Sequence, residues 1–347
     1  MTRIQNVVLL KSNNLRHLLR ELIKHQPISK VALAKKLHVG HSTITQILKP
    51  LIERNIVFEA AVGHSTGGRP PKLLRVNPDA AYGIVADMSG HRMRVCLINC
   101  AFDVVGAQGI AAQKDIYETL ELVVKVCHDL LTRVNGGKVL GICVAISGVM
   151  DPATGRISSS LIEGLRDVKL RDFLKTRLGI PVIVENDANL SALGEFMKME
   201  KDANNMFYIH MGEGLGGGLI VNRDIFRGDR GYAGEIGRMV YNADNFRTVG
   251  DVYTQLVKFS RVEEDDLVKL LTAVVLNAVS LLDVVNFVVG GTAFQIDERV
   301  LLKVENKVKE LFYGFNVEIR KSTSQPDPIL VGAMEYLIEN VLTRSAI

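Results

Sequence analysis

The chain has 347 residues, of which 47% are hydrophobic and 23% charged, and its formal net charge is +4. A chain of this length is usually too long to fold around a single hydrophobic core, so we expect two or three domains. The sequence has no apolar run of about 18 residues, no apolar signal segment at its start and no CxxC pair among its four cysteines, so we expect a cytoplasmic protein without a membrane partner.

The charge is distributed unevenly along the chain. Residues 1–76, the head, contain 13 Lys and Arg against 3 Asp and Glu, whereas the remainder has 29 basic and 35 acidic residues. A small basic head on a mildly acidic body indicates contact with a polyanion. A solvated basic surface has the same composition, so charge alone does not decide between the two.

Apolar residues at helical spacing predict three helices in the head. The first is expected over about residues 13–25. The second begins after Ser29, which is a good N-cap. A turn over 38–40, in which Gly40 can adopt positive φ, leads to a third helix from near Ser42. Two helices joined by a three-residue turn with glycine form a helix-turn-helix unit.

The third helix is the expected DNA-reading helix. Its apolar residues share one side, and the other side carries small polar groups near the N-terminus, where recognition helices meet base edges. A helix with a purely structural role would more often carry Glu–Lys pairs there. The residues predicted to contact DNA are His41, Ser42, Thr43, Thr45, Gln46 and Lys49.

Two predicted strands, over 56–60 and 72–76, complete the head. The loop between them, HSTGGRPP, predicts a β-wing whose tip can place Arg69 in a narrow minor groove. A plain flexible linker is the alternative for this loop. We therefore predict a winged helix-turn-helix domain over residues 1–76 that binds a double-stranded DNA operator. A homodimer or a dimer of dimers is expected, because most such proteins read DNA symmetrically.

Strand and helix signals alternate over residues 80–347, the body, which is typical of an α/β fold. An apolar strand, a glycine-containing turn and a second apolar strand occur twice, beginning at Tyr82 and at Phe207. Two such units suggest a duplicated fold of two lobes with a ligand-holding cleft between them.

Polar residues follow two buried strands of the body. The strand over 139–146 leads into Gly148, and the strand over 181–184 leads into Asn186 and Asp187. Ligands of α/β proteins commonly bind where a strand passes into a helix. Asp187 could accept hydrogen bonds from a ligand or act as a general base, or it could simply cap the helix that follows.

Two glycine-rich loops lie further along the chain. Residues 212–218 could let a backbone approach a phosphate or a sugar, although a tight hairpin explains them equally well. Residues 231–238 place the carboxylate of Glu235 three residues before the guanidinium of Arg238.

These segments together resemble the ROK family (repressors, open reading frames and sugar kinases). The resemblance covers nearly the whole chain, and the helix-turn-helix places it with the repressor branch, the NagC-, Mlc- and XylR-like regulators. The matching stretches, in the family's order, are STGGRPPKLL (65–74), ISGVMDPATGRI (146–157), PVIVENDANLSALGE (181–195), GEGLGGGLIVN (212–222), GYAGEIG (231–237) and ILVGAME (329–335).

The resemblance implies an actin-like, hexokinase-like (ribonuclease H-like) body of two lobes that binds a sugar in its cleft. It implies that Asn186 and Asp187 bind sugar hydroxyls, that Glu235 binds the anomeric side, and that Gly148 contacts the sugar through its backbone. In the kinases of the family, the residue at the position of Asp187 is the catalytic base.

The first hairpin departs from the family's pattern. The kinases carry an Asp-x-Gly-Gly-Thr phosphate loop, whereas this chain has Asp87-Met88-Ser89-Gly90-His91. One glycine and the threonine hydroxyl are missing, so backbone approach to a phosphate is hindered. We expect no ATP binding, no enzymatic activity and a structural role for Asp87.

A second departure concerns zinc. The family has Glu-x-Gly-His followed by a zinc-binding cysteine cluster, but here Arg238 replaces the His and residues 241–260 contain no Cys. Zinc needs about four ligands, so we expect no structural zinc and no other cofactor. Because Arg binds planar anions well, Arg238 suggests an acidic or phosphorylated sugar as effector. Alternatively, Arg238 only pairs with Glu235 or another carboxylate to hold the loop.

The sequence therefore predicts a sugar-responsive, DNA-binding transcriptional regulator, a repressor of carbohydrate-use genes whose ROK domain is catalytically degenerate. One alternative is an active sugar kinase that carries a DNA-binding head, which would need a working ATP loop. The other is a DNA-binding or architectural protein that senses no ligand, for which no sugar should change the melting temperature.

Overall fold

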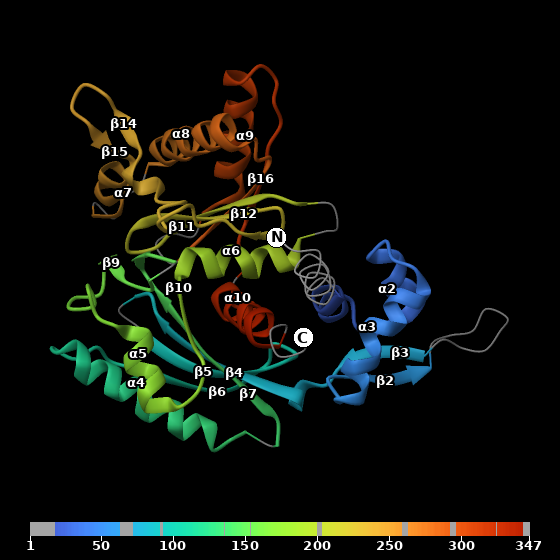
Figure 1. Cartoon of the computed structure of the whole chain (residues 1–347). Helices are drawn as coiled ribbons and strands as arrows, with labels where there is room; N and C mark the ends of the chain where they lie inside the picture. The colour runs from blue at the N-terminus through green and yellow to red at the C-terminus, as the bar shows by residue number, and fades with distance from the viewer. Residues whose placement is uncertain are drawn as a thin grey trace.

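The computed structural model shows a small N-terminal unit, the head, followed by two larger lobes (Figure 1). Within the described part of the chain, no helix is long and apolar enough to cross a membrane. The described residues are 18–62, 72–90, 93–134, 136–152, 154–199, 203–258, 263–291, 296–323 and 325–342.

The head contains helices and a small antiparallel sheet of order β1-β3-β2, and the predicted helices and strands are confirmed where they are described. Residues 18–25 are helical; the start of the predicted first helix and the loop with Arg69 lie outside the described residues. The other elements are β1 (Ile28–Ser29), α2 (Lys30–Lys36), α3 (His41–Glu53), β2 (Val57–Val62) and β3 (Lys72–Val76).

In the turn between α2 and α3, the residue with a left-handed backbone conformation is not the predicted one. His38 has φ +53°, whereas Gly40 has φ −68° and ψ 156° and is the N-cap of α3. The expectation of positive φ at Gly40 is wrong, because an N-cap residue takes extended backbone angles. The other predicted cap is confirmed, since Ser29 Oγ accepts the Ala32 N–H at 3.1 Å.

The first lobe of the body is built on a five-stranded sheet of order β10-β7-β4-β5-β6. β4, β5 and β6 form antiparallel pairs, and β7 and β10 run parallel to β4. Apolar residues of α4 and α5 pack on one face of this sheet. The elements are β4 (Ala81–Met88), β5 (Met93–Asn99), β6 (Val104–Ile110), α4 (Ile116–Leu131), β7 (Lys138–Ile146), β8 (Gly148–Met150), β9 (Ile157–Ser160), α5 (Leu170–Leu178) and β10 (Val182–Asn186).

The second lobe repeats this pattern with the order β17-β16-β11-β12-β13, so the predicted duplication is confirmed. Apolar residues of α7, α8 and α9 pack on one face of its sheet. The elements are β11 (Met206–Met211), β12 (Leu215–Val221), β13 (Asp224–Ile225), β14 (Val240–Asn242), β15 (Arg247–Thr248), α7 (Val249–Lys258), α8 (Glu264–Leu282), β16 (Asn286–Gly290), α9 (Glu298–Leu311) and β17 (Glu318–Lys321).

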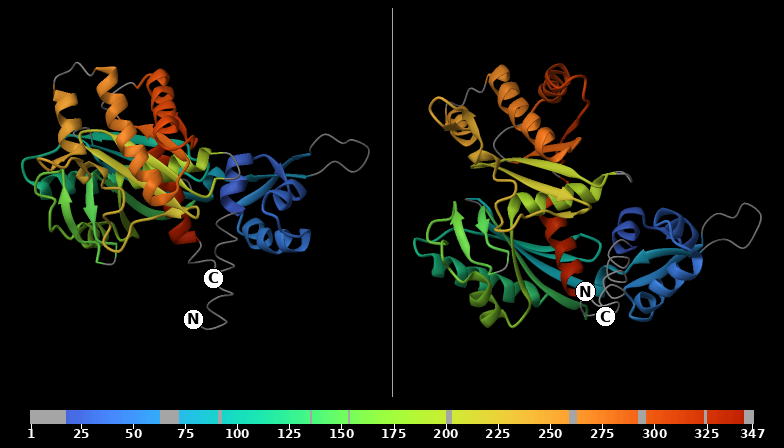
Figure 2. Two further views of the ribbon diagram at one scale, coloured as in Figure 1. Left: turned by 90° about the horizontal axis from the view of Figure 1, so that it is seen from above. Right: turned by 45° about the horizontal axis from the view of Figure 1, so that its top comes forward.

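Two helices, α6 (Asp187–Lys198) and α10 (Pro328–Leu337), lie between the two sheets (Figures 1 and 2). They touch backbone to backbone. A Cβ on Gly194 would lie 2.0 Å from the Pro328 carbonyl oxygen, and one on Gly332 would lie 1.9 Å from that of Leu190. Only glycine allows this approach, so these two backbone contacts fix the helices against each other.

The head packs directly on the body. Buried residues of the head, including Leu18 and Leu22, belong to the same apolar cluster as Val85 of β4 and Leu337 of α10. The head is therefore docked on the first lobe and on α10.

Candidate functional site

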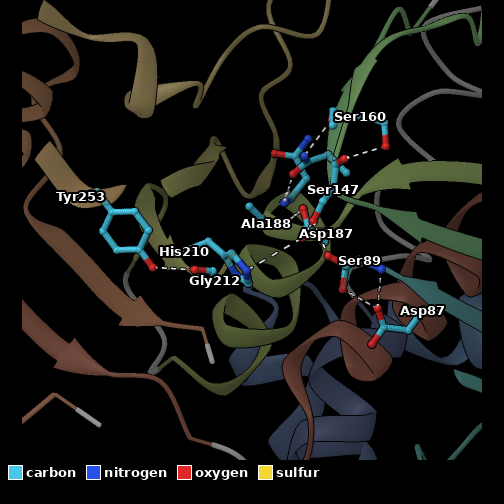
Figure 3. A network of polar contacts seen from close by, with 12 residues as sticks. Asp87, Ser89, Ser147, Ser160, Asp187, Ala188, His210, Gly212 and Tyr253 are labelled. Carbon is cyan, nitrogen blue, oxygen red and sulfur yellow. Dashed lines mark hydrogen bonds and ion pairs between the residues drawn. The ribbon is translucent and has the colours of Figure 1, made fainter. Parts of the chain in front are cut away.

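Asp187 lies at the centre of a polar network where strands of the first lobe end (Figure 3). It is the first residue of α6 and is buried. The Ala188 N–H donates to its Oδ1 at 2.9 Å, and the Ser147 hydroxyl lies 2.6 Å from its Oδ2. The same hydroxyl lies 2.6 Å from the Ser89 carbonyl oxygen.

The Ser147 hydroxyl has one proton and two oxygen neighbours, which bears on the protonation of Asp187. When Ser147 donates to the Ser89 carbonyl, the short contact with Asp187 needs a proton on the carboxyl group. Burial raises the pKa of Asp187, although His210 and local hydrogen bonds oppose the shift. The raised pKa moves Asp187 toward the protonated form, in which its carboxyl group can donate to Ser147 Oγ.

Asn186, rather than Asp187, is the N-cap of α6. Its Oδ1 accepts the Asn189 N–H at 3.0 Å, and its Nδ2 donates to the Gly148 carbonyl at 3.0 Å. The N-cap position belongs to Asn186, while Asp187 accepts a first-turn N–H of α6, from Ala188. The structure brings Gly148, Asn186 and Asp187 into one network, and their contact with a ligand stays a prediction.

Glu235 and Arg238 pair with each other on a loop of the second lobe. Arg238 Nε lies 3.2 Å from Glu235 Oε2, and the Arg238 side chain is 62% exposed. A Cβ on Gly231 would lie 2.1 Å from the Met150 carbonyl, so the loop touches the first lobe. No hydrogen bond or ion pair of the described residues joins the pair to Asp187. This is the arrangement expected if Arg238 only holds the loop.

The donor set of this region does not fit structural zinc. The described residues include no group of three or more His, Cys, Asp or Glu side chains that could hold a metal ion. The segment after Arg238 forms β14, β15 and α7 and contains no cysteine. The four cysteines are buried in the first lobe, where burial raises the pKa of each thiol. They supply no thiolate set of the kind that zinc requires.

Asp87, on β4, is held by donors of this chain. Arg94 Nε and Nη2 lie 3.1 and 3.0 Å from Asp87 Oδ2, and Ser89 donates its N–H and hydroxyl to Oδ1 at 3.2 and 2.5 Å. Arg94 also pairs with Asp327. Because both oxygens are engaged and the side chain is buried, Asp87 does not fit the magnesium ion that accompanies a nucleotide. Its contacts are those of a structural residue.

Three further residues of this region were not predicted: Arg94, His210 and Arg227. Arg227 Nε and Nη2 lie 2.8 and 2.7 Å from the buried Glu185. The single arginine in the apolar strand β5 was a visible signal for Arg94. No sequence signal marks His210, because its partner lies on another element.

A cavity of about 980 Å³ opens beside the network, large enough for a sugar. Ser89, His210, Gly290 and Asp327 are among its lining residues. His210 Nε2 lies 3.9 Å from Asp187 Oδ2, and its Nδ1 is buried without a hydrogen-bond partner. The cavity therefore adjoins the network through Ser89 and His210. The predicted ligand residues are not among its lining residues: Gly148, Asn186, Asp187, Glu235 and Arg238.

The predicted DNA-reading side of α3 is on the surface. Ile44 and Leu48 are fully buried on the opposite side of the helix. The predicted contact residues are exposed or, for Thr43, partly exposed: His41, Ser42, Thr43, Thr45, Gln46 and Lys49. Their accessibility fits the predicted role, and contact with DNA stays a prediction.

The ROK family model matches residues 82–250 of the chain. The xylose repressor of Bacillus spizizenii is 30% identical over 240 residues, which cover 68% of this chain and 62% of that protein. The chain spans about 60% of the length of such curated relatives.

Solved structures share the fold. A ROK family transcriptional regulator described as a homolog of the E. coli MLC protein has a TM-score of 0.74 at 18% identity and covers 97% of this chain and 98% of its own. The ROK hexokinase from Thermus thermophilus has a TM-score of 0.58 at 20% identity, covering 76% and 97%. The hexokinase-like fold predicted for the body is confirmed. The sequence match and the shared fold show that the chain carries a ROK family domain, as predicted.

Proposed function

We propose that the protein is a sugar-responsive, DNA-binding transcriptional regulator that represses carbohydrate-use genes. The observation that carries this proposal is the combination, in one chain, of the exposed polar side of α3 with a two-lobed ROK domain. Curated relatives named xylose repressors support the repressor branch.

In this proposal the head, residues 1–76, is a winged helix-turn-helix domain that binds double-stranded DNA. α3 reads base edges with its exposed polar side chains, and the hairpin of β2 and β3 is the wing, with Arg69 in the minor groove. Two heads in a homodimer, or four in a dimer of dimers, read a symmetric operator. In this proposal the protein is cytoplasmic, because the DNA that it binds lies in the cytoplasm.

The effector in this proposal is a sugar bound between the lobes. Its hydroxyl groups meet Gly148, Asn186, Asp187 and Glu235, as the family resemblance implies. Xylose is the first candidate because the relatives are named xylose repressors. The pairing of Arg238 with Glu235 supports a neutral sugar over an acidic or phosphorylated one.

We infer that the body has no kinase activity. A general base must reach the substrate, whereas Asp187 is buried in the network around Ser147. Asp87 is occupied by Arg94 and Ser89. An active kinase remains the second candidate, because Asp187 is retained and sugar kinases share the fold.

Footprinting on the DNA upstream of the protein's own gene, with and without xylose and a wider sugar panel, tests the proposal. We expect protection of a two-fold symmetric site that changes when the effector is added. The absence of any protected site would contradict a regulator. A coupled assay of ADP release on the same panel separates the second candidate, since sustained turnover would establish a kinase.

A further inference from the structure

Near each end of α10, an acidic residue pairs with an arginine from another element. Asp327, its N-cap, pairs with Arg94, which also holds Asp87. Near the other end, Glu335 pairs with Arg20 of the head. Because an α-helix rises 1.5 Å per residue, the eight steps from Asp327 to Glu335 span about 12 Å. One short helix thus connects two charged clusters in different parts of the protein.

The cluster at the head is buried. The side chains of Arg20 and Glu335 are 12% and 3% exposed, and Glu339 lies 3.6 Å from Arg20 Nη2. Arg20 Nη1 also donates to the Arg223 carbonyl at 2.9 Å. Removing one partner of a buried pair leaves an uncompensated charge, which is strongly unfavourable. The first described helix of the head, residues 18–25, is therefore fixed to α10.

The other end of α10 forms part of the cavity wall. Asp327, Pro328 and Ile329 line the cavity of about 980 Å³, together with Ser89 and His210. A molecule that fills the cavity therefore meets the first turn of α10.

α10 has no side-chain layer separating it from α6 where the two helices cross. The contacts of Gly194 with Pro328 and of Gly332 with Leu190 are between backbones. Closely packed helices shift as units rather than deform. Because α6 begins at Asp187, a displacement there is also passed to α10. In Figures 1 and 2, α10 runs from beneath α6 toward the head.

We propose that α10 links occupancy of the cavity to the position of the head, with Arg20 as the positioning residue at the head. A ligand can shift the head only if it binds one arrangement of α10 more tightly than another. The difference between the two affinities sets the size of the population shift. The proposal rests on the proposed function for the meaning of the head as the DNA-binding part.

Amide hydrogen exchange of the full-length protein, read by mass spectrometry, tests the link without DNA or effector. Arg20→Gln should speed exchange over residues 18–25 by about tenfold or more. Arg94→Gln removes the pair with Asp327 at the start of α10 and the pair with Asp87 on β4. We expect it to speed exchange over both α10 and residues 18–25 by about 2- to 30-fold. Arg94→Lys, which keeps the charge, should restore part of the protection.

Arg177→Gln is the matched control, because Arg177 pairs with Glu121 in the first lobe, away from α10. It should leave exchange over residues 18–25 unchanged. If Arg94→Gln loosens α10 but leaves residues 18–25 as they were, the link is refuted. Faster exchange throughout the body, α9 included, would also refute it, as general destabilisation. None of these exchange measurements needs DNA, whereas the proposed function is tested by DNA footprinting. A negative result for the α10 link can therefore be told apart from a negative result for the proposed function.

Discussion

Arg94 places two guanidinium nitrogens, at 3.0 and 3.1 Å, on one carboxylate oxygen of Asp87. Ser89 occupies the other oxygen through its N–H and its hydroxyl. A buried carboxylate satisfied in this way has little to offer a metal ion. The cation beside this carboxylate is therefore a side chain of the protein itself, Arg94.

We expect that magnesium ATP does not bind. Titration calorimetry should show only dilution heat, and a coupled assay should detect no ADP release with any neutral sugar. A ROK sugar kinase measured in parallel is the positive control. Saturable ATP binding or sustained turnover would show that the Arg94 pairing opens to admit nucleotide.

Gly194→Ala should destabilise the protein although alanine is the better helix former. In an exposed helix the change would stabilise by about 1 kcal/mol. Here the new Cβ would lie 2.0 Å from the Pro328 carbonyl oxygen, so we expect a loss of about 3 kcal/mol or more as α6 and α10 separate. The free energy of unfolding in urea measures it. Gly216→Ala is the control, because a Cβ there meets nothing within 4 Å.

The head and the two-lobed body could be predicted because their signals are local. The hydroxyl of Ser29 predicts the start of α2, because serine is a common N-cap residue. The two apolar hairpins predict the two similar lobes. β1 was missed because two residues, Ile28 and Ser29, are too short to show alternation. The left-handed residue was misplaced at Gly40 because glycine permits positive φ without requiring it.

The site was predicted less completely. Gly148, Asn186 and Asp187 follow strand ends, and parallel strands β7 and β10 bring strand ends together. The partners that decide the chemistry come from elsewhere: Arg94 from β5 and His210 from the second lobe. A single sequence gives no measure of such contacts between distant elements.

Asp187→Asn should stabilise the protein at neutral pH. Burial raises the pKa of Asp187 in the folded state, so at a pH between the unfolded and the folded pKa the folded protein holds a proton that the unfolded protein has released. Stability from this group is fully present below its unfolded pKa of about 3.9 and is lost as pH rises. The Asn variant avoids that loss, so its gain in Tm should be larger at pH 7 than at pH 4.

Asp297→Asn is the control with the opposite sign. Arg299 lowers the pKa of Asp297 to about 2 through a side-chain and a backbone hydrogen bond. Its contribution is present above the unfolded pKa and is lost as pH falls toward 2. This variant should have a lower Tm than the parent at neutral pH. A Tm gain for Asp187→Asn that does not depend on pH would contradict a raised pKa.

Gln46→Ala should weaken binding to the operator found by footprinting. Glutamine can make a bidentate contact with adenine, worth about 1–3 kcal/mol of discrimination. Fluorescence anisotropy should show about 5- to 150-fold weaker operator binding and unchanged affinity for unrelated DNA. Lys125→Ala, at an exposed position of α4 in the body, should change neither. Equal losses on both DNAs would mean that Gln46 does not read sequence.

Arg238→Ala distinguishes the two roles of that residue. Arg238 is 62% exposed and pairs with Glu235, and exposed pairs contribute about 0–1 kcal/mol. If Arg238 only holds the loop, the variant should bind the effector within a few-fold of the parent in calorimetry. The panel should contain neutral sugars, uronic acids and sugar phosphates. Selective loss of acidic ligands would instead assign Arg238 to an anion, since a guanidinium matches a carboxylate or a phosphate in two parallel hydrogen bonds.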